Sequence, residues 1–240
     1  MISTVRPDMA RGLRLAFAGL VLALSGAAPL AASSRTGEED APAAGVVRVG
    51  MLVYGEDEQT GVCFADDFLD TLARETHMRL HRAFEPVKLA SDELFDYPFV
   101  VMTGQRAFTL SDAEREQLRQ YVLHGGFVLA SAGCSSERWA ESFRETMNAV
   151  FDDAALEPID LDHPLFHTVY DIDYLDVRGS DEASPPLFAS RIGDAVRVVF
   201  SPMGLNDTAN AGDGCCCCGG NEVRNARLIN ANILAYALTH

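Results

Sequence analysis

The first half of the chain alternates short apolar runs with amphipathic segments, and this alternation restricts the fold more than any other feature. Short apolar runs without a polar face are typical of strands buried on both sides of a sheet. The amphipathic segments carry helix signals, such as the capping box that begins at Ser111 and the Gly125-Gly126 stop. The predicted order is strand 46–54, helix 64–76, strand 81–89, a strand within 93–104, helix from 111, strand 127–131 and helix 137–150.

Strands and helices at this spacing form right-handed βαβ units. The sequence therefore predicts an α/β fold with a single doubly wound, mostly parallel sheet sandwiched by helices. The second half is less regular. We expect a loop over 151–162, a hairpin of 187–191 and 195–201 around Gly193-Asp194, and a last helix over 222–238 with Asn221 as its cap.

The first 32 residues predict an export signal. Arg6, Arg11 and Arg14 precede the apolar run from Leu15 to Leu24, which small residues follow. An uncleaved membrane anchor is the alternative, because the apolar run is only slightly short of a spanning helix. We therefore expect residues 1–32 to be a signal peptide or anchor, 33–45 a linker and 46–240 one domain. The domain is expected to be exported, either periplasmic or anchored facing the periplasm.

Charge limits the choice of partner. The formal net charge of −16 argues against nucleic acid and against anionic membrane surfaces, and it favours cations, including metals. With 48% hydrophobic and 22% charged residues, the composition is that of a globular protein rather than a disordered chain.

Four consecutive cysteines, Cys215 to Cys218, make the most unusual chemical feature of the sequence. Cysteine is usually retained for its chemistry rather than its bulk. In a doubly wound sheet, ligands bind beyond the carboxyl ends of the strands. Cys63 follows the first strand, Cys134 follows the strand 127–131, and the run follows the strand that ends at Ser201. We therefore expect all six thiols at one edge of the sheet.

Thiolates and imidazoles are ligands for zinc or copper(I). Side chains alternate along an extended segment, so Cys215 and Cys217 would face one way and Cys216 and Cys218 the other. A Cys215/Cys218 pair has a separation familiar from zinc sites. The further ligands predicted for such a pair are Cys63, Cys134, His163 and His167.

Disulfides are the competing prediction for the same thiols. An exported protein meets an oxidising compartment, and six is an even number of cysteines. Neighbouring cysteines pair poorly, because their Cα atoms are about 3.8 Å apart and a usual bridge spans about 4.4 to 6.8 Å. Bridges from the run to Cys63 or Cys134 are geometrically easier.

Two polar segments are candidates for binding a small ligand. Glycines before a helix present backbone N–H groups that can hold an anion, as predicted for Gly219, Gly220, Asn221 and Glu222. Asn206 and Asp207 follow a strand at the same edge of the sheet and are candidates to orient a ligand, although Asx turns also explain such a pair.

Long motifs distributed over 46–240 resemble a bacterial family known as domain of unknown function 4159. The motifs are 100–104, the glycines 125–126, 132–136, 163–167, 204–208 and the cysteine run with 219–222. The resemblance implies a glutamine amidotransferase-like, flavodoxin-like architecture and carries no established reaction. It also gives a family-level hint of partners in membrane-associated AAA ATPase and von Willebrand factor A-type systems.

The amidotransferase likeness makes Cys134 a candidate nucleophile. It lies at a strand-to-helix turn similar to the nucleophile elbow of those enzymes, where a helix N-terminus lowers a thiol pKa. The sequence departs from them at 200–203, where Phe-Ser-Pro-Met stands in place of His-Pro-Glu. His163 or His167 would then have to act as the base.

Two functions follow from these patterns. One is an exported binding or assembly domain with a Cys/His-rich site for metal or redox chemistry at the carboxyl edge of the sheet. The alternative is a cysteine-dependent hydrolase or amidotransferase-like enzyme with Cys134 as nucleophile. The sequence leaves open whether there is any catalysis.

Overall fold

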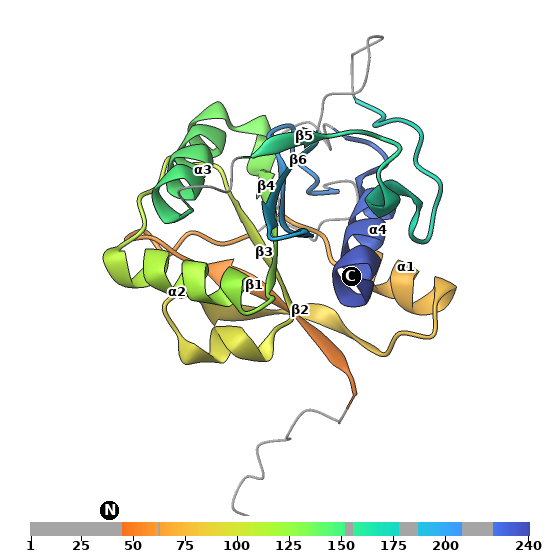
Figure 1. The fold of residues 1–240 in the computed structure, drawn as a ribbon, viewed down its shortest axis with the longest axis horizontal. Coiled ribbons are helices and arrows are strands. Elements are labelled where there is room, and N and C mark those ends of the chain that lie inside the picture. The colour runs from red at the N-terminus through yellow and green to blue at the C-terminus, as the bar shows by residue number, and fades with distance from the viewer. Residues whose placement is uncertain (1–44, 62, 152–155, 178–186, 208–222) are drawn as a thin grey trace, which may run out of the picture. The chain divides into compact units, whose positions relative to one another are not determined.

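A seven-stranded sheet with the order β2-β1-β3-β4-β7-β6-β5 forms the centre of the protein (Figure 1). The structure is a computed structural model that describes residues 45–61, 63–151, 156–177, 187–207 and 223–240. All of these belong to one compact unit, Pro42–His240. The predicted signal segment lies outside the described residues. The strands are β1 (Val47–Val53), β2 (Leu80–Lys88), β3 (Phe99–Gly104), β4 (Phe127–Ala132), β5 (Glu157–Ile159), β6 (Leu187–Ile192) and β7 (Ala195–Ser201).

Five neighbouring strands, from β2 to β7 in the sheet order, run parallel to one another. The hairpin predicted around Gly193 is present as the antiparallel pair β6 and β7. The loop prediction for 151–162 was wrong at β5, which adds an antiparallel edge strand beside β6. β5 has only three residues and contains Pro158, so it carries no periodic signal.

The described part of the chain also contains four α-helices and three short 3-10 helices, and all but α4 lie between strands in the sequence. They are α1 (Asp67–Glu75), α2 (Asp112–Leu123), α3 (Glu137–Val150), α4 (Ala226–Thr239), η1 (Asp92–Asp96), η2 (Gly133–Ser135) and η3 (Pro164–His167). α1 and α4 share one apolar core with one face of the sheet, and α2 and α3 share a second core with the other face. The chain is therefore an α/β protein with one mostly parallel sheet between two helical layers.

Local chemistry fixes where the helices begin. The capping box predicted at Ser111 is present, with Glu114 as its partner. α4 begins at Ala226, later than predicted, because Asn225 is used to hold a neighbouring loop. Its side-chain carbonyl accepts from the Asp176 N–H at 3.0 Å and its amide donates to the Tyr174 carbonyl at 2.9 Å. The predicted cap Asn221 lies outside the described residues.

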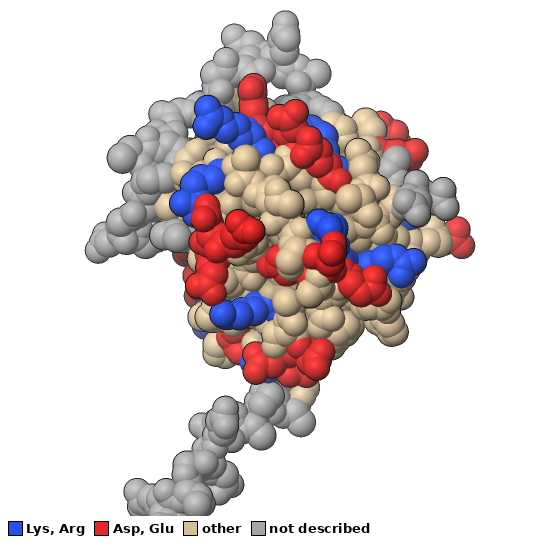
Figure 2. Space-filling model, turned by 90° about the vertical axis from the view of Figure 1, so that its left-hand side faces the viewer, with Lys and Arg blue, Asp and Glu red and all other residues tan. Residues whose placement is uncertain are grey.

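The surface reflects the acidic composition. Figure 2 shows Asp and Glu gathered in several clusters on the side where α2 and α3 lie, with individual Lys and Arg side chains between them. The prediction that nucleic acid is not a partner rests on the net charge of the sequence and stays a prediction.

Candidate functional site

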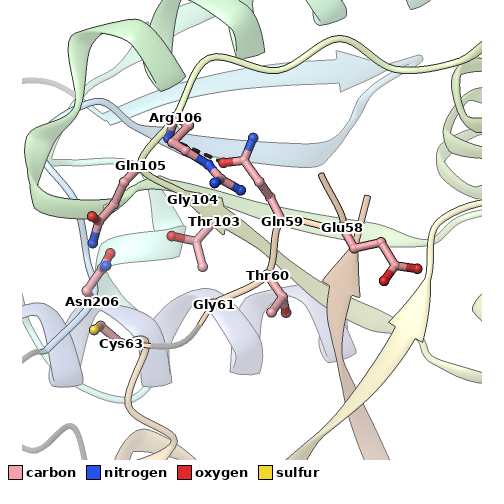
Figure 3. Close-up of a pocket in the computed structure, with 11 residues that line it drawn as sticks. Glu58, Gln59, Thr60, Gly61, Cys63, Thr103, Gly104, Gln105, Arg106 and Asn206 are labelled. Carbon is pink, nitrogen blue, oxygen red and sulfur yellow. Dashed lines mark hydrogen bonds between the residues drawn. The ribbon is translucent and has the colours of Figure 1, made fainter. Parts of the chain in front are cut away.

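A pocket of about 390 Å³ opens at the carboxyl edge of the sheet, at the ends of β1 and β3 (Figure 3). The sheet order places β2 on one side of β1 and β3 on the other, so the chain reverses direction across the sheet here. Doubly wound sheets bind ligands at such a switch point. The residues that line the pocket are Glu58, Gln59, Thr60, Gly61, Cys63, Thr103, Gly104, Gln105, Arg106, Gly133 and Asn206.

A row of three hydroxyl groups crosses the sheet, and its first member, Thr103, lines this pocket. Thr103 on β3 pairs in register with Ser131 on β4, and Ser131 pairs with Ser201 on β7. Partners in neighbouring strands point to the same face of a sheet, so the three side chains share the face that α1 and α4 cover. All three are at most 1% exposed. We call Thr103, Ser131 and Ser201 the hydroxyl row.

Ser131 connects the row to the segment after β7. Its hydroxyl donates to Oδ1 of Asn206 at 2.7 Å and accepts from the Leu205 N–H at 2.8 Å. The Leu205 carbonyl in turn accepts from Nδ2 of Asn230 on α4 at 2.8 Å. The main-chain carbonyl of Asn206 accepts from the Ala65 N–H at 3.0 Å. This buried network holds Asn206 at the pocket wall.

Three buried polar atoms around this network lack hydrogen-bond partners. Among the described residues, Oγ1 of Thr103, Oγ of Ser201 and Oδ1 of Asn230 are buried without one. Buried polar atoms in proteins are nearly always hydrogen-bonded, so three such atoms around one network are unusual. Thr103 is the member of this set that lines the pocket, and Figure 3 shows its hydroxyl directed toward Asn206 and Gln105.

Two glutamines form the upper wall of the pocket. Gln105 donates from Nε2 to Sγ of Cys134 at 3.1 Å, and its main-chain carbonyl accepts from the Ser136 hydroxyl at 2.7 Å. The Gln59 side chain donates to the Ala107 carbonyl and accepts from the Arg106 N–H, both at 3.3 Å. The Gln59 bonds tie the loop after β1 to the loop after β3, and the Gln105 bonds tie the loop after β3 to the segment after β4.

Charged groups stand at the rim, where each has a partner of opposite sign. The Glu58 carboxylate lies 2.9 Å from the Lys88 ammonium, and Arg106 lies 3.5 Å from Asp57. The base of the pocket is formed by neutral groups, the Thr103 hydroxyl and the Asn206 carboxamide.

The structure places Cys63 and Cys134 at the carboxyl edge, where the topology predicts them. Cys63 is buried and lines the pocket. Cys134 follows β4 and has φ 52° and ψ 35°, a left-handed conformation that is uncommon for a residue other than glycine. Strained conformations of this kind concentrate at functional sites.

The two predicted histidines lie elsewhere. The His163 ring is 5.5 Å from the Tyr236 ring near the end of α4, and its Nε2 is 3.2 Å from Nη2 of Arg191. Asn230 of α4 contacts the carboxyl edge through the Leu205 carbonyl. Tyr236 lies six residues further along the same helix, which is a rise of about 9 Å. Burial and the nearby Arg191 lower the pKa of His163. His163 therefore does not line the pocket with Cys63. Its predicted contact with Cys215 to Cys218, which lie outside the described residues, stays a prediction.

His167 belongs to the same η3 segment on α4. Its ring contacts the Asp171 carboxylate at 3.2 Å and the Leu161 carbonyl at 2.9 Å, and these contacts raise its pKa. The segment is held by Asn232 of α4, which donates to the Phe166 and Tyr170 carbonyls. His167 is thus engaged by its own loop, and its predicted role beside the cysteine run, which lies outside the described residues, stays a prediction.

The remaining site predictions concern Asn206, Asp207 and a segment outside the described residues. Asn206 lines the pocket, and its neighbour Asp207 is 5% exposed with φ 47°. Among the side chains that the structure describes, no three His, Cys, Asp or Glu residues come close enough to hold a metal ion. The predictions of zinc, copper or disulfides rest on residues outside that part: Cys215, Cys216, Cys217 and Cys218. The predicted anion site, Gly219, Gly220, Asn221 and Glu222, lies outside it too.

Sequence reasoning missed the hydroxyl row and the two glutamines. A signal for the row does exist, because three apolar runs each end in a hydroxyl residue: Val-Val-Met-Thr at 100–103, Val-Leu-Ala-Ser at 128–131 and Val-Val-Phe-Ser at 198–201. No comparable pattern marks Gln59 or Gln105.

Sheet order and pocket together define the class: an α/β domain with a polar pocket at the carboxyl edge of a mostly parallel sheet. Residues 50–238 match the family described as Domain of unknown function (DUF4159), and the chain belongs to this family. No curated protein matches the chain significantly. None of the helices in the described part is both long and apolar enough to span a bilayer.

Proposed function

We propose that this domain binds a small polar molecule in the pocket at the carboxyl edge of its sheet. The observation that carries the proposal is the Thr103 hydroxyl, which lines the pocket, is 1% exposed and has no hydrogen-bond partner among the described residues. A buried hydroxyl without a partner costs free energy, which a ligand that bonds to it would recover. The switch-point position of the pocket supports the same function.

A fragment screen on the full chain tests this proposal. Small polar fragments are added to isotope-labelled protein, and the amide shifts of residues 58–61, 103–106, 133 and 206 are followed by NMR. We expect hits to move these signals together. Gln105→Trp should abolish the shifts by filling the pocket from its exposed wall. Ala107→Trp, two residues further along the same exposed segment and outside the pocket lining, is the matched control and should retain them. Hits that perturb only other surfaces would contradict the proposal.

The architecture also supports a proposed kinship with glutamine amidotransferases. The parallel sheet and the left-handed Cys134 at a strand-to-helix turn are the features in its favour. They keep a cysteine-dependent hydrolase or transferase as the second candidate function. Against it, both histidines proposed as its base contact α4 and the loops around it.

Alkylation tests that second candidate. A catalytic Cys134 would react with iodoacetamide within minutes near neutral pH, and Cys134→Ser would remove the labelled peptide. Slow labelling, at the rate of an ordinary thiol, would count against an enzyme. The result does not bear on the binding pocket, whose test uses no cysteine chemistry.

A metal or redox role for the cysteine run is a separate proposal. It is supported by the position of two cysteines, Cys63 and Cys134, at the edge to which the run is predicted to return. Metal analysis of protein purified under reducing conditions, with Cys215→Ser and Cys218→Ser as controls, tests the metal. Mass spectrometry of the unreduced protein counts the free thiols. Absence of stoichiometric metal and a full set of free thiols would contradict both versions.

A further inference from the structure

The hydrogen bonds around Ser131 fix what the pocket presents to a ligand. A serine hydroxyl has one proton, and it accepts here from the Leu205 N–H, so its own proton is the one shared with Asn206. The atom of Asn206 that receives this proton must be the carbonyl oxygen, which assigns the orientation of the carboxamide. Nδ2 of Asn206 is therefore left as a donor.

That donor is directed toward the pocket. A methyl group added to Gly133, which lines the pocket, would lie 3.4 Å from Nδ2 of Asn206. Thr103 supplies the second group at the base, a hydroxyl that can both donate and accept. Figure 3 shows the two side chains on the same side of the cavity, with Gln105 above them. The base thus offers one fixed donor and one group of either kind.

Among the described residues that line the pocket, none brings a charged side chain to this base. Two lining residues are charged, Glu58 and Arg106, and both are exposed at the rim and paired with Lys88 and Asp57. A carboxylate or phosphate at the base would lose its hydration without meeting a free cation, and a cation would not meet a free anion. The net charge of −16 adds a further cost for an anionic ligand.

Hydroxyl groups are the ligand groups that match this arrangement. Each hydroxyl group can accept a hydrogen bond from Nδ2 of Asn206 and can either donate to or accept from the Thr103 hydroxyl. None of them requires a group of opposite charge. The volume of about 390 Å³ is near the lower limit for small-molecule pockets and suits one ring rather than a chain of them. We infer that the pocket binds an uncharged polyhydroxylated molecule of about the size of one sugar ring. This inference rests on the proposed binding function and narrows its ligand.

Calorimetry and saturation-transfer NMR on the full chain test the ligand class. The probes are D-glucose, D-galactose, D-mannose and myo-inositol, with D-gluconate and D-glucosamine as charged counterparts of similar size. We expect at least one neutral probe to bind, and its charged counterparts to bind at least tenfold more weakly. A charged probe that binds as tightly as the neutral ones would overturn the inference, and so would a panel in which no neutral probe binds.

Thr103→Val removes the hydroxyl and nearly preserves the shape of the side chain. This substitution should lower the affinity for the neutral probe about tenfold, while the circular dichroism spectrum and the melting temperature stay near those of the wild type. Thr109→Val, at an exposed position outside the pocket lining, is the control and should bind as the wild type does. Binding that Thr103→Val and the pocket-filling Gln105→Trp both leave unchanged would place the probe elsewhere and refute the inference.

The two failures can be distinguished. If fragments of another chemical class shift the pocket signals while every neutral polyol fails, the binding function stands and the ligand class is wrong. If nothing shifts those signals, the binding function itself fails.

Discussion

The hydroxyl of Ser131 donates to the carbonyl oxygen of Asn206 across 2.7 Å and so joins the end of β4 to the segment that follows β7. Its cross-strand neighbour Ser201 has a hydroxyl that is equally buried but has no partner among the described residues. Two hydroxyls of the same type, side by side in one row, are thus expected to make opposite contributions to stability.

Ser131→Ala should destabilise the protein and Ser201→Ala should not. Loss of the Ser131 hydroxyl leaves the Leu205 N–H and Asn206 Oδ1 buried without that partner, which costs about 2 to 4 kcal/mol. Loss of the Ser201 hydroxyl removes an unsatisfied group, so the free energy of unfolding should stay within about 0.5 kcal/mol or rise. Urea unfolding with unchanged m-values measures both. Equal losses in the two variants would contradict this account of the row.

Tyr54→Phe should lower stability by about 2 kcal/mol, because its hydroxyl accepts from Nε1 of Trp139 and donates to the Thr103 carbonyl. Burial raises the pKa of Tyr54 well above its usual value, so the hydroxyl stays protonated and able to donate. Trp139 is the single tryptophan of the chain, so a change in its fluorescence reports the loss of this hydrogen bond. Tyr174→Phe, at a side chain 63% exposed, is the control and should change neither quantity. A Tyr54→Phe variant as stable as the control would be the opposing result.

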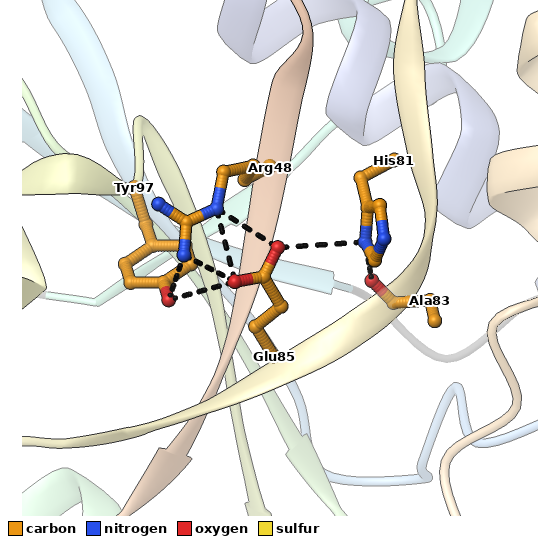
Figure 4. Close-up of polar contacts among 5 residues, drawn as sticks. All are labelled: Arg48, His81, Ala83, Glu85 and Tyr97. Carbon is orange, nitrogen blue, oxygen red and sulfur yellow. Dashed lines mark hydrogen bonds and ion pairs between the residues drawn. The ribbon is translucent and has the colours of Figure 1, made fainter. Parts of the chain in front are cut away.

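Glu85→Gln should reduce the dependence of stability on pH. In Figure 4, Glu85 lies between Arg48 and His81, and Nε of Arg48 donates to its two oxygens at 2.8 and 2.9 Å. These bonds lower the pKa of Glu85. Because the folded pKa lies below the unfolded value of about 4.3, the contribution is present above that value and is lost as the pH falls through the folded pKa.

At pH 7 the Glu85→Gln variant should be less stable than the wild type by about 1 to 2 kcal/mol, a figure reduced because the pair is partly exposed. The difference should shrink on acidification below about pH 4. Urea unfolding at several pH values gives the comparison. Glu141→Gln, at an exposed position on α3, should stay within about 0.5 kcal/mol of the wild type throughout. A Glu85→Gln difference that is constant with pH would refute the assignment.

Gly204→Ala and Gly125→Ala separate backbone strain from steric contact. Both glycines have positive φ, +84° and +95°, so each substitution carries a conformational cost of about 1 kcal/mol. A Cβ at Gly204 would also lie 2.6 Å from the Ala132 carbonyl oxygen, whereas a Cβ at Gly125 would meet nothing within 4 Å. We therefore expect Gly204→Ala to be the more destabilising by about 1 to 3 kcal/mol in urea unfolding. Similar losses would show that the contact at Gly204 relaxes freely.

The succession of strands and helices along the chain, the mostly parallel sheet and the placement of Cys63 and Cys134 after strand ends could be predicted from the sequence, because apolar runs, caps and connection rules determine them locally. The alignment of the three hydroxyl groups in one row could not, although three apolar runs each end in Ser or Thr. Its members align only because β7 pairs directly with β4, and that pairing brings together residues 128–131 and 198–201. The presence of one Ser or Thr at the end of each run does not predict that register.

The histidines show a different limit. The distance between His163 and the thiols depends on how the irregular segment after β5 runs along α4. Asn232 determines that path through four hydrogen bonds to main-chain groups of Phe166, Val169 and Tyr170. Spacing and residue type suggested imidazole ligands but contain no information about a helix that follows more than sixty residues later.

The pocket draws its lining from four separate parts of the chain, the segments after β1, β3, β4 and β7. A bound molecule would therefore be released when any one of these segments opened. In hydrogen exchange, occupancy should slow the amides at all four strand ends together, by a factor that rises with ligand concentration above its Kd. Four short loops with separate opening equilibria would then behave as a single cooperative unit.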